Sequence, residues 1–247
     1  MIRVTITRAR GSSPREAGAT MIVTQDSAQG TIGGGQLEYM AIDRARQMLA
    51  RAEDGAVMDI PLGPEIGQCC GGRVELTLTR IATAPPAPEY PQVLIFGAGH
   101  VGRALSRALA LLPLRPILID QRAPELAQAT GETRLTPLPE SEIRAAPMGT
   151  AYVILTHDHA LDFLLAAEAL KRPDAPYIGM IGSRTKLAQF RRFARAQGLA
   201  TDRLTCPIGA GHSRDKRPEI IAAFTAAEII GRLTQTTSSM NKYPCDS

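Results

Sequence analysis

The sequence lacks several features that would place a protein in a class at once. It has no apolar run long enough for a signal peptide or a membrane-spanning helix. None of its four cysteines forms a C-x-x-C zinc pair, because Cys69 and Cys70 are adjacent and Cys206 and Cys245 stand alone. These absences predict a protein of the reducing cytoplasm that keeps its thiols reduced and does not associate with a membrane.

A block of charge of one sign is also missing. The 28 basic and 24 acidic residues leave a net charge of only +4 over 247 residues. The densest basic run, residues 191–195, has the spacing of a solvated helix face. The sequence therefore predicts no nucleic-acid binding, whereas its 44% hydrophobic content is enough to bury a core and excludes disorder throughout.

Proline and alanine are concentrated in residues 82–91, where neither a helix nor a central strand can continue. We interpret this segment as a linker between two domains. The polar C-terminal stretch has no periodicity and is predicted to be a disordered tail. The predicted organisation is a domain over 1–81, the linker over 82–91, a second domain over 92–233 and a tail over 234–247.

The two domains differ in their hydrophobic patterns. Before the linker, 1–7, 20–23 and 73–79 alternate like strands and 37–52 has helical periodicity, which predicts a small α+β domain. After the linker, short apolar runs alternate with amphipathic stretches. This alternation is typical of α/β proteins and predicts a Rossmann-like, doubly wound parallel sheet.

A G-x-G-x-x-G motif, formed by Gly97, Gly99 and Gly102, follows the first apolar run of the second domain and opens a helix. In dinucleotide-binding folds these glycines turn the chain, admit a pyrophosphate and allow helix–strand packing. Asp120 ends the next apolar run, where an acid would hold a ribose 2′-hydroxyl. The motif predicts NAD(P) or another nucleotide as a ligand. The nearby Arg122 leaves open the choice between cofactors with and without a 2′-phosphate. Alternatively, the glycines serve packing alone.

Loops that follow the strands of such a sheet share one crevice, so Gly99, residues 156–159 and residues 182–184 are expected to meet there. His157 and His159 could carry a proton, but adjacent residues point in different directions and do not favour a metal site. Ser183 and Arg184 could hold an anion or simply cap a helix.

The first domain has its own glycine-rich turn, Gly33, Gly34 and Gly35, which leads directly into the predicted helix. Free amides at a helix start favour an anion such as a phosphate. A second turn adds two hydroxyls and a guanidinium, which suit an anionic or pterin-like ligand. These are Ser12, Ser13 and Arg15.

Two adjacent thiols, Cys69 and Cys70, lie among Gly67, Gly71 and Gly72. Glycines let the backbone approach a ligand closely, and sulfur is a soft metal ligand. We therefore favour a role for one of these thiols at a metal or in sulfur transfer. Alternatively, the two cysteines are inert small residues in a buried turn, or they form a vicinal disulfide.

Seven segments together resemble the XdhC/CoxI family, and they follow one another along nearly the whole chain. They are residues 11–15, 18–19, 33–38, 67–72, 97–102, 156–159 and 177–183. Residues 209–216 depart from the more apolar loop expected in that family.

The resemblance implies a molybdenum cofactor (molybdopterin) chaperone rather than an enzyme. Such a protein holds the cofactor while a cysteine desulfurase replaces an oxo ligand with sulfur, and it then delivers the cofactor to xanthine dehydrogenase. A homodimer is the expected assembly. The resemblance assigns Gln68, Cys69 and Cys70 to the cofactor, with the two cysteines as metal ligands, beside the turns of the first domain.

Two other functions remain compatible with the residues. The first is an NAD(P)-dependent oxidoreductase of a small molecule, with His157 or His159 as the proton donor. The second is a redox sensor, in which a nucleotide occupies the Rossmann cleft and Cys69 and Cys70 act as a thiol switch.

Overall fold

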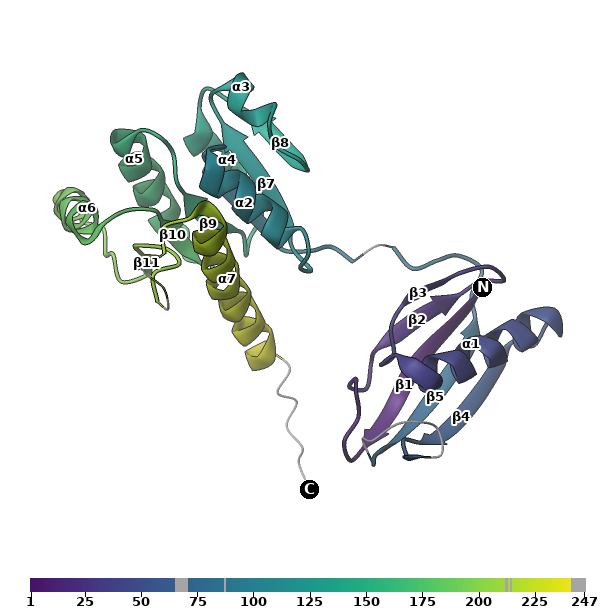
Figure 1. The fold of residues 1–247 in the computed structure, drawn as a ribbon. Coiled ribbons are helices and arrows are strands. Elements are labelled where there is room, and N and C mark those ends of the chain that lie inside the picture. Colours follow the sequence, from purple (N-terminus) through teal and green to yellow (C-terminus); the bar gives the residue numbers. More distant parts are fainter. Residues whose placement is uncertain (65–70, 87, 212, 214, 241–247) are drawn as a thin grey trace. The chain divides into compact units, whose positions relative to one another are not determined.

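The structure is a computed structural model that describes residues 1–64, 71–86, 88–211, 213 and 215–240, with side chains as far as residue 234. The chain divides into two compact units, Met1–Pro88 and Glu89–Ser247. This division falls within the proline-rich segment 82–91. Each unit has its own sheet (Figure 1) and its own core.

Unit 1 is an antiparallel sheet with strand order β3-β2-β1-β5-β4 and one helix, among the residues described. Its elements are β1 (Ile2–Arg10), β2 (Thr20–Val23), β3 (Ala28–Gly30), α1 (Gly35–Ala50), β4 (Gly55–Pro61) and β5 (Arg73–Arg80).

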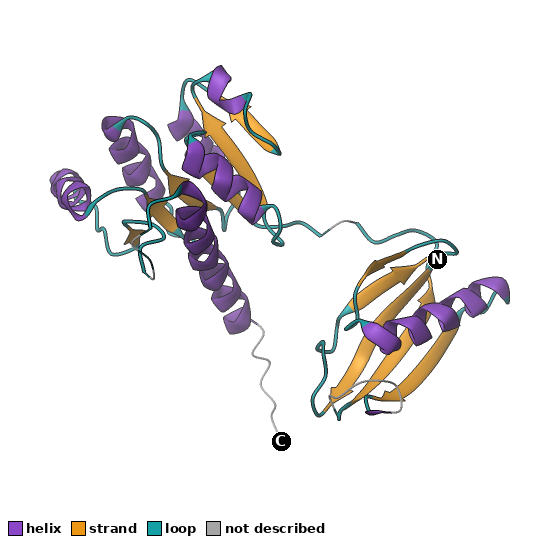
Figure 2. Ribbon diagram, viewed as in Figure 1, coloured by secondary structure: helices purple, strands orange, loops and turns teal. Residues whose placement is uncertain are grey.

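Helix α1 covers one face of this sheet (Figure 2). Strand β1 alternates, so that Ile2, Val4 and Ile6 are buried against the helix and Arg3 and Thr7 are exposed. The helix contributes residues at helical spacing to the same core: Leu37, Ala41, Ala45 and Met48. The opposite face of the sheet carries no helix in the described part of unit 1, and its side chains are mainly threonine, arginine and acidic residues.

Unit 2 is a parallel sheet with strand order β11-β10-β9-β6-β7-β8, among the residues described. Its strands are β6 (Gln92–Phe96), β7 (Arg115–Asp120), β8 (Glu132–Leu135), β9 (Ala151–Ile154), β10 (Ile178–Met180) and β11 (Leu204–Thr205). Its helices are α2 (His100–Leu109), α3 (Ala123–Leu126), α4 (Pro139–Ala145), α5 (His159–Leu170), α6 (Arg184–Ala196) and α7 (Pro218–Met240).

The sheet of unit 2 is covered on both faces. In β6, Val93 and Ile95 pack with α2 and α7, whereas Leu94 and Phe96 pack with α4, α5 and α6. The chain leaves β6 towards β7 on one side and later returns to place β9 on the other. This order confirms the predicted Rossmann-like doubly wound sheet, and it creates a switch point between β6 and β9, where such sheets bind ligands.

The C-terminal region differs from the sequence-based prediction. The tail is predicted to begin at residue 234, but α7 continues to Met240. The Thr234 hydroxyl donates to the Ile230 carbonyl at 2.8 Å, so this polar side chain has its hydrogen-bond partner within the helix. Helix α7 thus extends into the predicted tail as far as residue 240, and residues 241–247 lie outside the described part.

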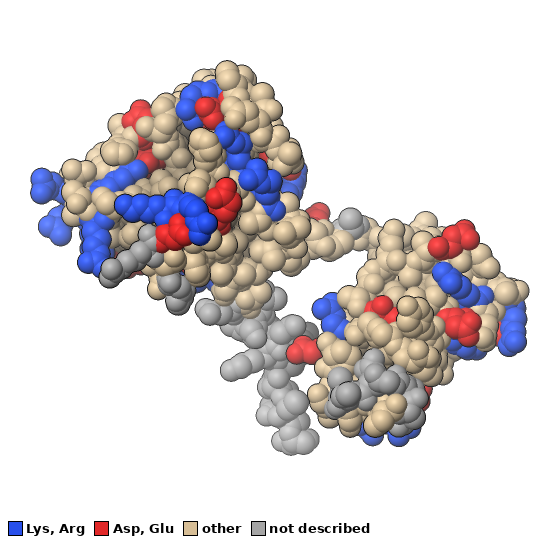
Figure 3. Space-filling view, viewed as in Figure 1, with Lys and Arg blue, Asp and Glu red and all other residues tan. Residues whose placement is uncertain are grey.

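The molecular surface carries both signs of charge. On the face drawn in Figure 3, Lys and Arg lie interspersed with Asp and Glu over both units. Among the described residues, no helix is long and apolar enough to cross a membrane.

Candidate functional site

The turn over residues 11–15 in unit 1 lies against the backbone at Gly71 and Gly72. Ser12 forms a bridge with Gly71, and a Cβ at Gly72 would collide with the carbonyl oxygens of Arg10 and Ser12. Only glycine can occupy position 72, because the backbone of the turn passes directly over it. The end of the predicted thiol segment and the serine turn therefore meet at one point.

The glycine turn before α1 contacts the other side of the same serine turn. A Cβ at Gly33 would lie 2.5 Å from Pro14 Cγ, and Gly33 has φ +129°, in the region that favours glycine. The structure thus brings together two turns that the sequence predicts as ligand-binding. Ser12 and Arg15 are exposed beside this contact, whereas the Ser13 hydroxyl donates to the Arg15 carbonyl at 2.7 Å and shapes the turn.

The predicted anion nest at Gly33–Gly35 is largely filled by a side chain of the protein itself. The Glu38 carboxylate accepts hydrogen bonds from the amides of Ile32, at 3.0 Å, and Gly34, at 2.9 Å. It also accepts one from the Thr31 hydroxyl, which in turn accepts from the Gly33 amide. The prediction of free amides is therefore wrong for Gly33 and Gly34, because the Thr31 hydroxyl and an acid in the first turn of α1 accept from them.

Glu38 is held in its charged form. Burial raises its pKa, but the hydrogen bonds from the Thr31 hydroxyl and from the backbone amides together outweigh this effect. The pKa of Glu38 therefore lies below its usual value. An incoming phosphate would have to displace this carboxylate from the amides of Ile32 and Gly34.

The three other predicted cofactor residues of unit 1, Gln68, Cys69 and Cys70, lie outside the described residues. Of the cysteines that are described, Cys206 is the one free thiol. Burial raises the pKa of Cys206 to about 11, so this thiol stays protonated at neutral pH and is a poor metal ligand or nucleophile.

The three glycines of the Rossmann motif in unit 2 differ in the space that surrounds them. A Cβ at Gly97 would collide with the Leu155 carbonyl, and one at Gly102 with the Gly97 carbonyl, so both are required by packing. At Gly99, by contrast, a Cβ would meet nothing within 4 Å, and the φ of −67° is open to any residue. Packing therefore does not explain Gly99, which leaves room for a ligand to approach the start of α2.

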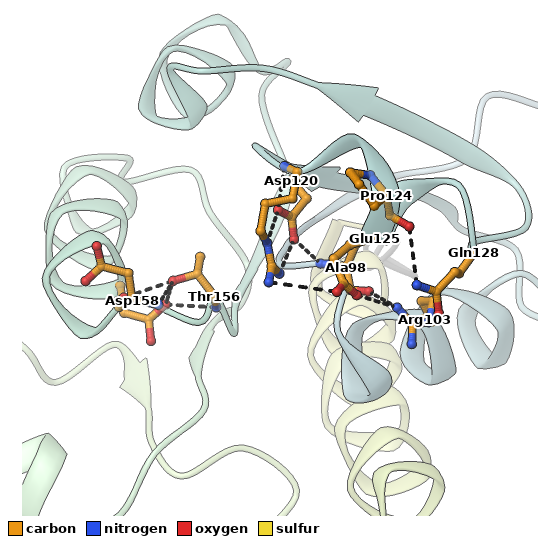
Figure 4. A network of polar contacts seen from close by, with 10 residues as sticks. Ala98, Arg103, Asp120, Pro124, Glu125, Gln128, Thr156 and Asp158 are labelled. Carbon is orange, nitrogen blue, oxygen red and sulfur yellow. Dashed lines mark hydrogen bonds and ion pairs between the residues drawn. The ribbon is translucent and has the colours of Figure 1, made fainter.

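Asp120 is engaged by the protein rather than free for a ribose (Figure 4). Its carboxylate accepts from the Ala98 amide at 2.7 Å and from two guanidinium nitrogens of Arg122 at 3.0 Å each. Burial raises the pKa of Asp120, but these hydrogen bonds outweigh it and hold the pKa below the usual value. A ribose hydroxyl would have to compete with Arg122 for this carboxylate.

Side chains hold both the backbone amide and the backbone carbonyl of Ala98. While Asp120 accepts from its amide, the buried guanidinium of Arg103 donates to its carbonyl at 2.5 Å. Arg103 is itself held by Glu125, at 2.8 Å. The network in Figure 4 therefore fixes the loop that carries Gly99.

A cleft of about 380 Å³ lies at the switch point of the sheet. Its lining includes Gly99, Arg122, Thr156 and His157, and Ile181 brings the end of β10 to the same place. The loops at Gly99 and at residues 156–159 thus meet at the cleft as predicted, and the loop over residues 182–184 directly follows Ile181. Ser183 is not turned to the cleft as an anion ligand, because its hydroxyl accepts from the Lys186 amide at 3.2 Å and caps α6.

The loop over residues 157–159 contains the cap of helix α5. Asp158 caps α5, accepting from the Ala160 amide at 2.8 Å. No group of three or more His, Cys, Asp or Glu side chains that could hold a metal occurs among the described residues. His157 remains a lining residue of the cleft.

A buried ion pair behind the cleft was not predicted. The Lys186 ammonium contacts the Asp162 carboxylate, whose other oxygen accepts from the Thr156 amide at 2.9 Å and from the Thr156 hydroxyl at 2.7 Å. Asp162 is fully buried and Lys186 nearly so. The pair fixes Thr156 at the cleft wall. Its only signal in the sequence is a charged residue within each of the segments that form α5 and α6.

Comparisons with known proteins agree over both units. Residues 93–229, more than half of the chain, match the family model described as the XdhC Rossmann domain, and residues 1–60 match the model of the XdhC and CoxI family. The uncharacterized protein YqeB of Escherichia coli (strain K12) is 27% identical over 252 residues, which cover 91% of this chain and 42% of that protein. The chain thus spans less than half the length of this curated relative.

A solved structure with a similar fold is described as a xanthine dehydrogenase (BH1974) from Bacillus halodurans. It matches with a TM-score of 0.77 at 18% identity, covering 100% of this chain and 93% of that chain. At this identity the likeness shows a shared fold.

Proposed function

The chain belongs to the XdhC and CoxI family, and from this premise we propose that it is an accessory protein in the maturation of xanthine dehydrogenase. It would bind the molybdenum cofactor as cargo, hold it while a cysteine desulfurase supplies sulfur, and deliver it to the dehydrogenase. The setting would be the reducing cytoplasm, and the assembly a homodimer.

The observation that carries this proposal is the meeting of two turns and the Gly71–Gly72 backbone at one end of unit 1 (Figure 1). Ser12 and Arg15 are exposed at this meeting point, and Gly71 directly follows Cys70 in the sequence. A guanidinium and a hydroxyl suit an oxyanion group of the cargo. Thiolates at positions 69 and 70 would suit its soft molybdenum–sulfur centre.

The glycines at this point allow the two turns and the Gly72 backbone to pack closely against one another. Positions 33 and 72 have no room for a side chain, because Gly33 faces the Pro14 ring and Gly72 faces the carbonyl oxygens of Arg10 and Ser12. Glu38 already occupies the amides of the glycine turn, so the turn supplies shape rather than free anion-binding amides. In this proposal the chain binds, shelters and releases its cargo, and carries out no redox step of its own.

The test is anaerobic binding of purified molybdenum cofactor, with molybdenum counted per chain after gel filtration. We expect near-stoichiometric retention by the wild type and by Cys206→Ala, whose thiol is protonated and distant in sequence from the turns. The double variant Cys69→Ala/Cys70→Ala should lose most of its molybdenum. Equal retention by the double variant would remove the thiols from the proposal, and no retention by the wild type would overturn it.

A second candidate function, nucleotide binding in unit 2, is favoured by the open space at Gly99 in the 380 Å³ cleft. The start of α2 would face the pyrophosphate of an NAD(P)-type ligand. We expect Gly99→Val to weaken NADH or NADPH binding at least tenfold without changing the fold, as measured by fluorescence titration and circular dichroism. Turnover of a carbonyl substrate by the nucleotide-loaded protein would favour the oxidoreductase alternative over the accessory protein.

A further inference from the structure

The uncovered face of the sheet in unit 1 has a hollow of about 300 Å³ at the end where β1 stops and β5 begins. Five charged side chains line it: Arg8, Arg10, Asp59, Arg73 and Glu75. Three of them are guanidinium groups and two are carboxylates, so the positive charges outnumber the negative charges by one.

A β-bulge places the arginines of β1 on this face. The register with β5 pairs Ile6 with Leu76 and then Arg8 with Glu75, so Thr7 is an extra residue. Without the bulge, Arg8 and Arg10 would point into the core, because Ile6 does. With it, Thr7 and Arg8 both face outward, and Ala9 takes the inward position opposite the buried Val74.

Across the strands of the hollow, Arg8 faces the opposite charge of Glu75, but two other pairs place like charges opposite each other. Arg10 lies directly opposite Arg73, and Asp59 lies directly opposite Glu75. Like charges at directly opposed positions destabilise an antiparallel pair. Such an arrangement is balanced when an anion lies between the two arginines.

The carboxylates only partly relieve this arrangement. Asp59 accepts from Arg73 Nε at 2.7 Å, and Glu75 accepts from the Thr7 hydroxyl at 3.0 Å. Within the described residues, the side chains of Arg8 and Arg10 have no hydrogen bond or ion pair. Two unpaired guanidinium forks therefore face the hollow beside a third that is already paired.

The hollow is next to the turns of the candidate site. Arg10 ends β1 immediately before Gly11, and its carbonyl lies against the position of Gly72. The glycine turn at α1, by contrast, has its amides occupied by Glu38. Arg8 and Arg10 thus provide donors that no acidic side chain among the described residues occupies.

We propose that this hollow binds the phosphate group of a small phosphomonoester, held between the guanidinium groups of Arg10 and Arg73 with Arg8 beside them. Planar guanidinium forks match phosphate oxygens in pairs, and a phosphate dianion neutralises the opposed arginines. The phosphate end of the molybdenum cofactor is a suitable occupant; this last step alone rests on the proposed function.

The experiment is equilibrium dialysis of the full chain against radiolabelled inorganic phosphate at low ionic strength. The wild type should bind phosphate saturably, and Arg10→Gln should bind it at least tenfold more weakly. Arg3→Gln is the matched control, because Arg3 is exposed on the same strand and the same face but lies outside the hollow. It should change the affinity less than twofold.

Thermal unfolding provides a second measurement that separates binding from folding. Phosphate should raise the melting temperature of the wild type and of Arg3→Gln, and not that of Arg10→Gln. Without phosphate, Arg10→Gln should melt at the same or a higher temperature, because it removes a like-charge pair. Absence of saturable binding, or equal weakening by Arg3→Gln, would overturn the proposal. Neither measurement requires the molybdenum cofactor, so failure of the proposed function would be seen separately.

Discussion

The two units each contain a glycine-rich turn that leads into a helix, and the two turns differ in what occupies them. In unit 1 the turn before α1 is closed by Glu38, which takes the amides of Ile32 and Gly34. In unit 2 the loop before α2 has no acid of its own in that position, and Gly99 faces open space at a cleft. A run of glycines before a helix therefore does not by itself indicate a ligand site.

The decisive feature is the residue one turn into the helix. An acid there can reach back and satisfy the free amides, as Glu38 does. Helix α2 has no acid in its first turn. The acid that serves the loop of unit 2, Asp120, comes from the next strand and fixes the Ala98 peptide without covering Gly99. This comparison leads to four predictions.

The largest effect is expected where the cleft of unit 2 depends on a buried ion pair. Lys186→Met leaves the Asp162 carboxylate buried without its partner, so unit 2 should lose about 3–5 kcal/mol of unfolding free energy. The control Lys171→Met removes an exposed partner of Glu168 and should cost less than about 1 kcal/mol. Urea denaturation, followed separately for each unit, measures both. Similar losses for the two variants would mean that the pair behind Thr156 is not a structural support.

The next prediction separates packing glycines from ligand glycines. Gly102→Ala drives a Cβ into the Gly97 carbonyl and should destabilise unit 2 by about 2–3 kcal/mol. Gly99→Ala meets no atom and should leave the stability nearly unchanged. Chemical denaturation of the two variants side by side measures the difference. If Gly99→Ala proves as destabilising as Gly102→Ala, the space at Gly99 is not available to a ligand.

A smaller effect is expected from opening the turn of unit 1. Glu38→Gln replaces charged hydrogen bonds by neutral ones and should cost about 1–2 kcal/mol. Because the pKa of Glu38 is lowered on folding, the stabilisation is fully present above its usual value of 4.5 and is lost as the pH falls through the folded value. Melting curves from pH 7 to pH 3 should therefore converge for wild type and variant at the acid end. Parallel curves over the whole range would show that Glu38 does not cap the turn.

The smallest change in stability is expected at a buried hydroxyl group of unit 2. Among the described residues, the Tyr152 hydroxyl in β9 is the one buried side-chain nitrogen or oxygen without a hydrogen-bond partner. Tyr152→Phe removes an unsatisfied group and should be neutral or stabilise unit 2 by up to about 1 kcal/mol. Differential scanning calorimetry measures the shift, and a clear loss of stability would reveal a partner for this hydroxyl.

The fold is largely predictable because it depends on short-range patterns. Alternation identifies β1 and β2, apolar runs identify β6 and β7, and Ser183 marks the start of α6. No strand is predicted over 55–61, although Ala56, Met58 and Ile60 alternate inward in β4. Asp59 within the segment and Gly55 and Pro61 at its ends make that pattern weak.

The site is less predictable because its main features depend on contacts between distant residues. The bulge at Thr7 follows from the register between β1 and β5, which no local pattern specifies. Lys186 and Asp162 are 24 residues apart and meet only when α5 and α6 are packed. Gly99 lies at the cleft, as the motif predicts, but the pairing of the Asp120 carboxylate with Arg122 is found only in the structure.

The clamped peptide at Ala98 also has an entropic consequence. Its amide and its carbonyl are both held by side chains, Asp120 and Arg103, which are themselves fixed by further ion pairs. The conformational freedom of this loop is thus given up when unit 2 folds, before any ligand arrives. A ligand that binds at Gly99 would meet a preorganised loop, so its association should need little ordering of the protein and should proceed without a slow conformational step.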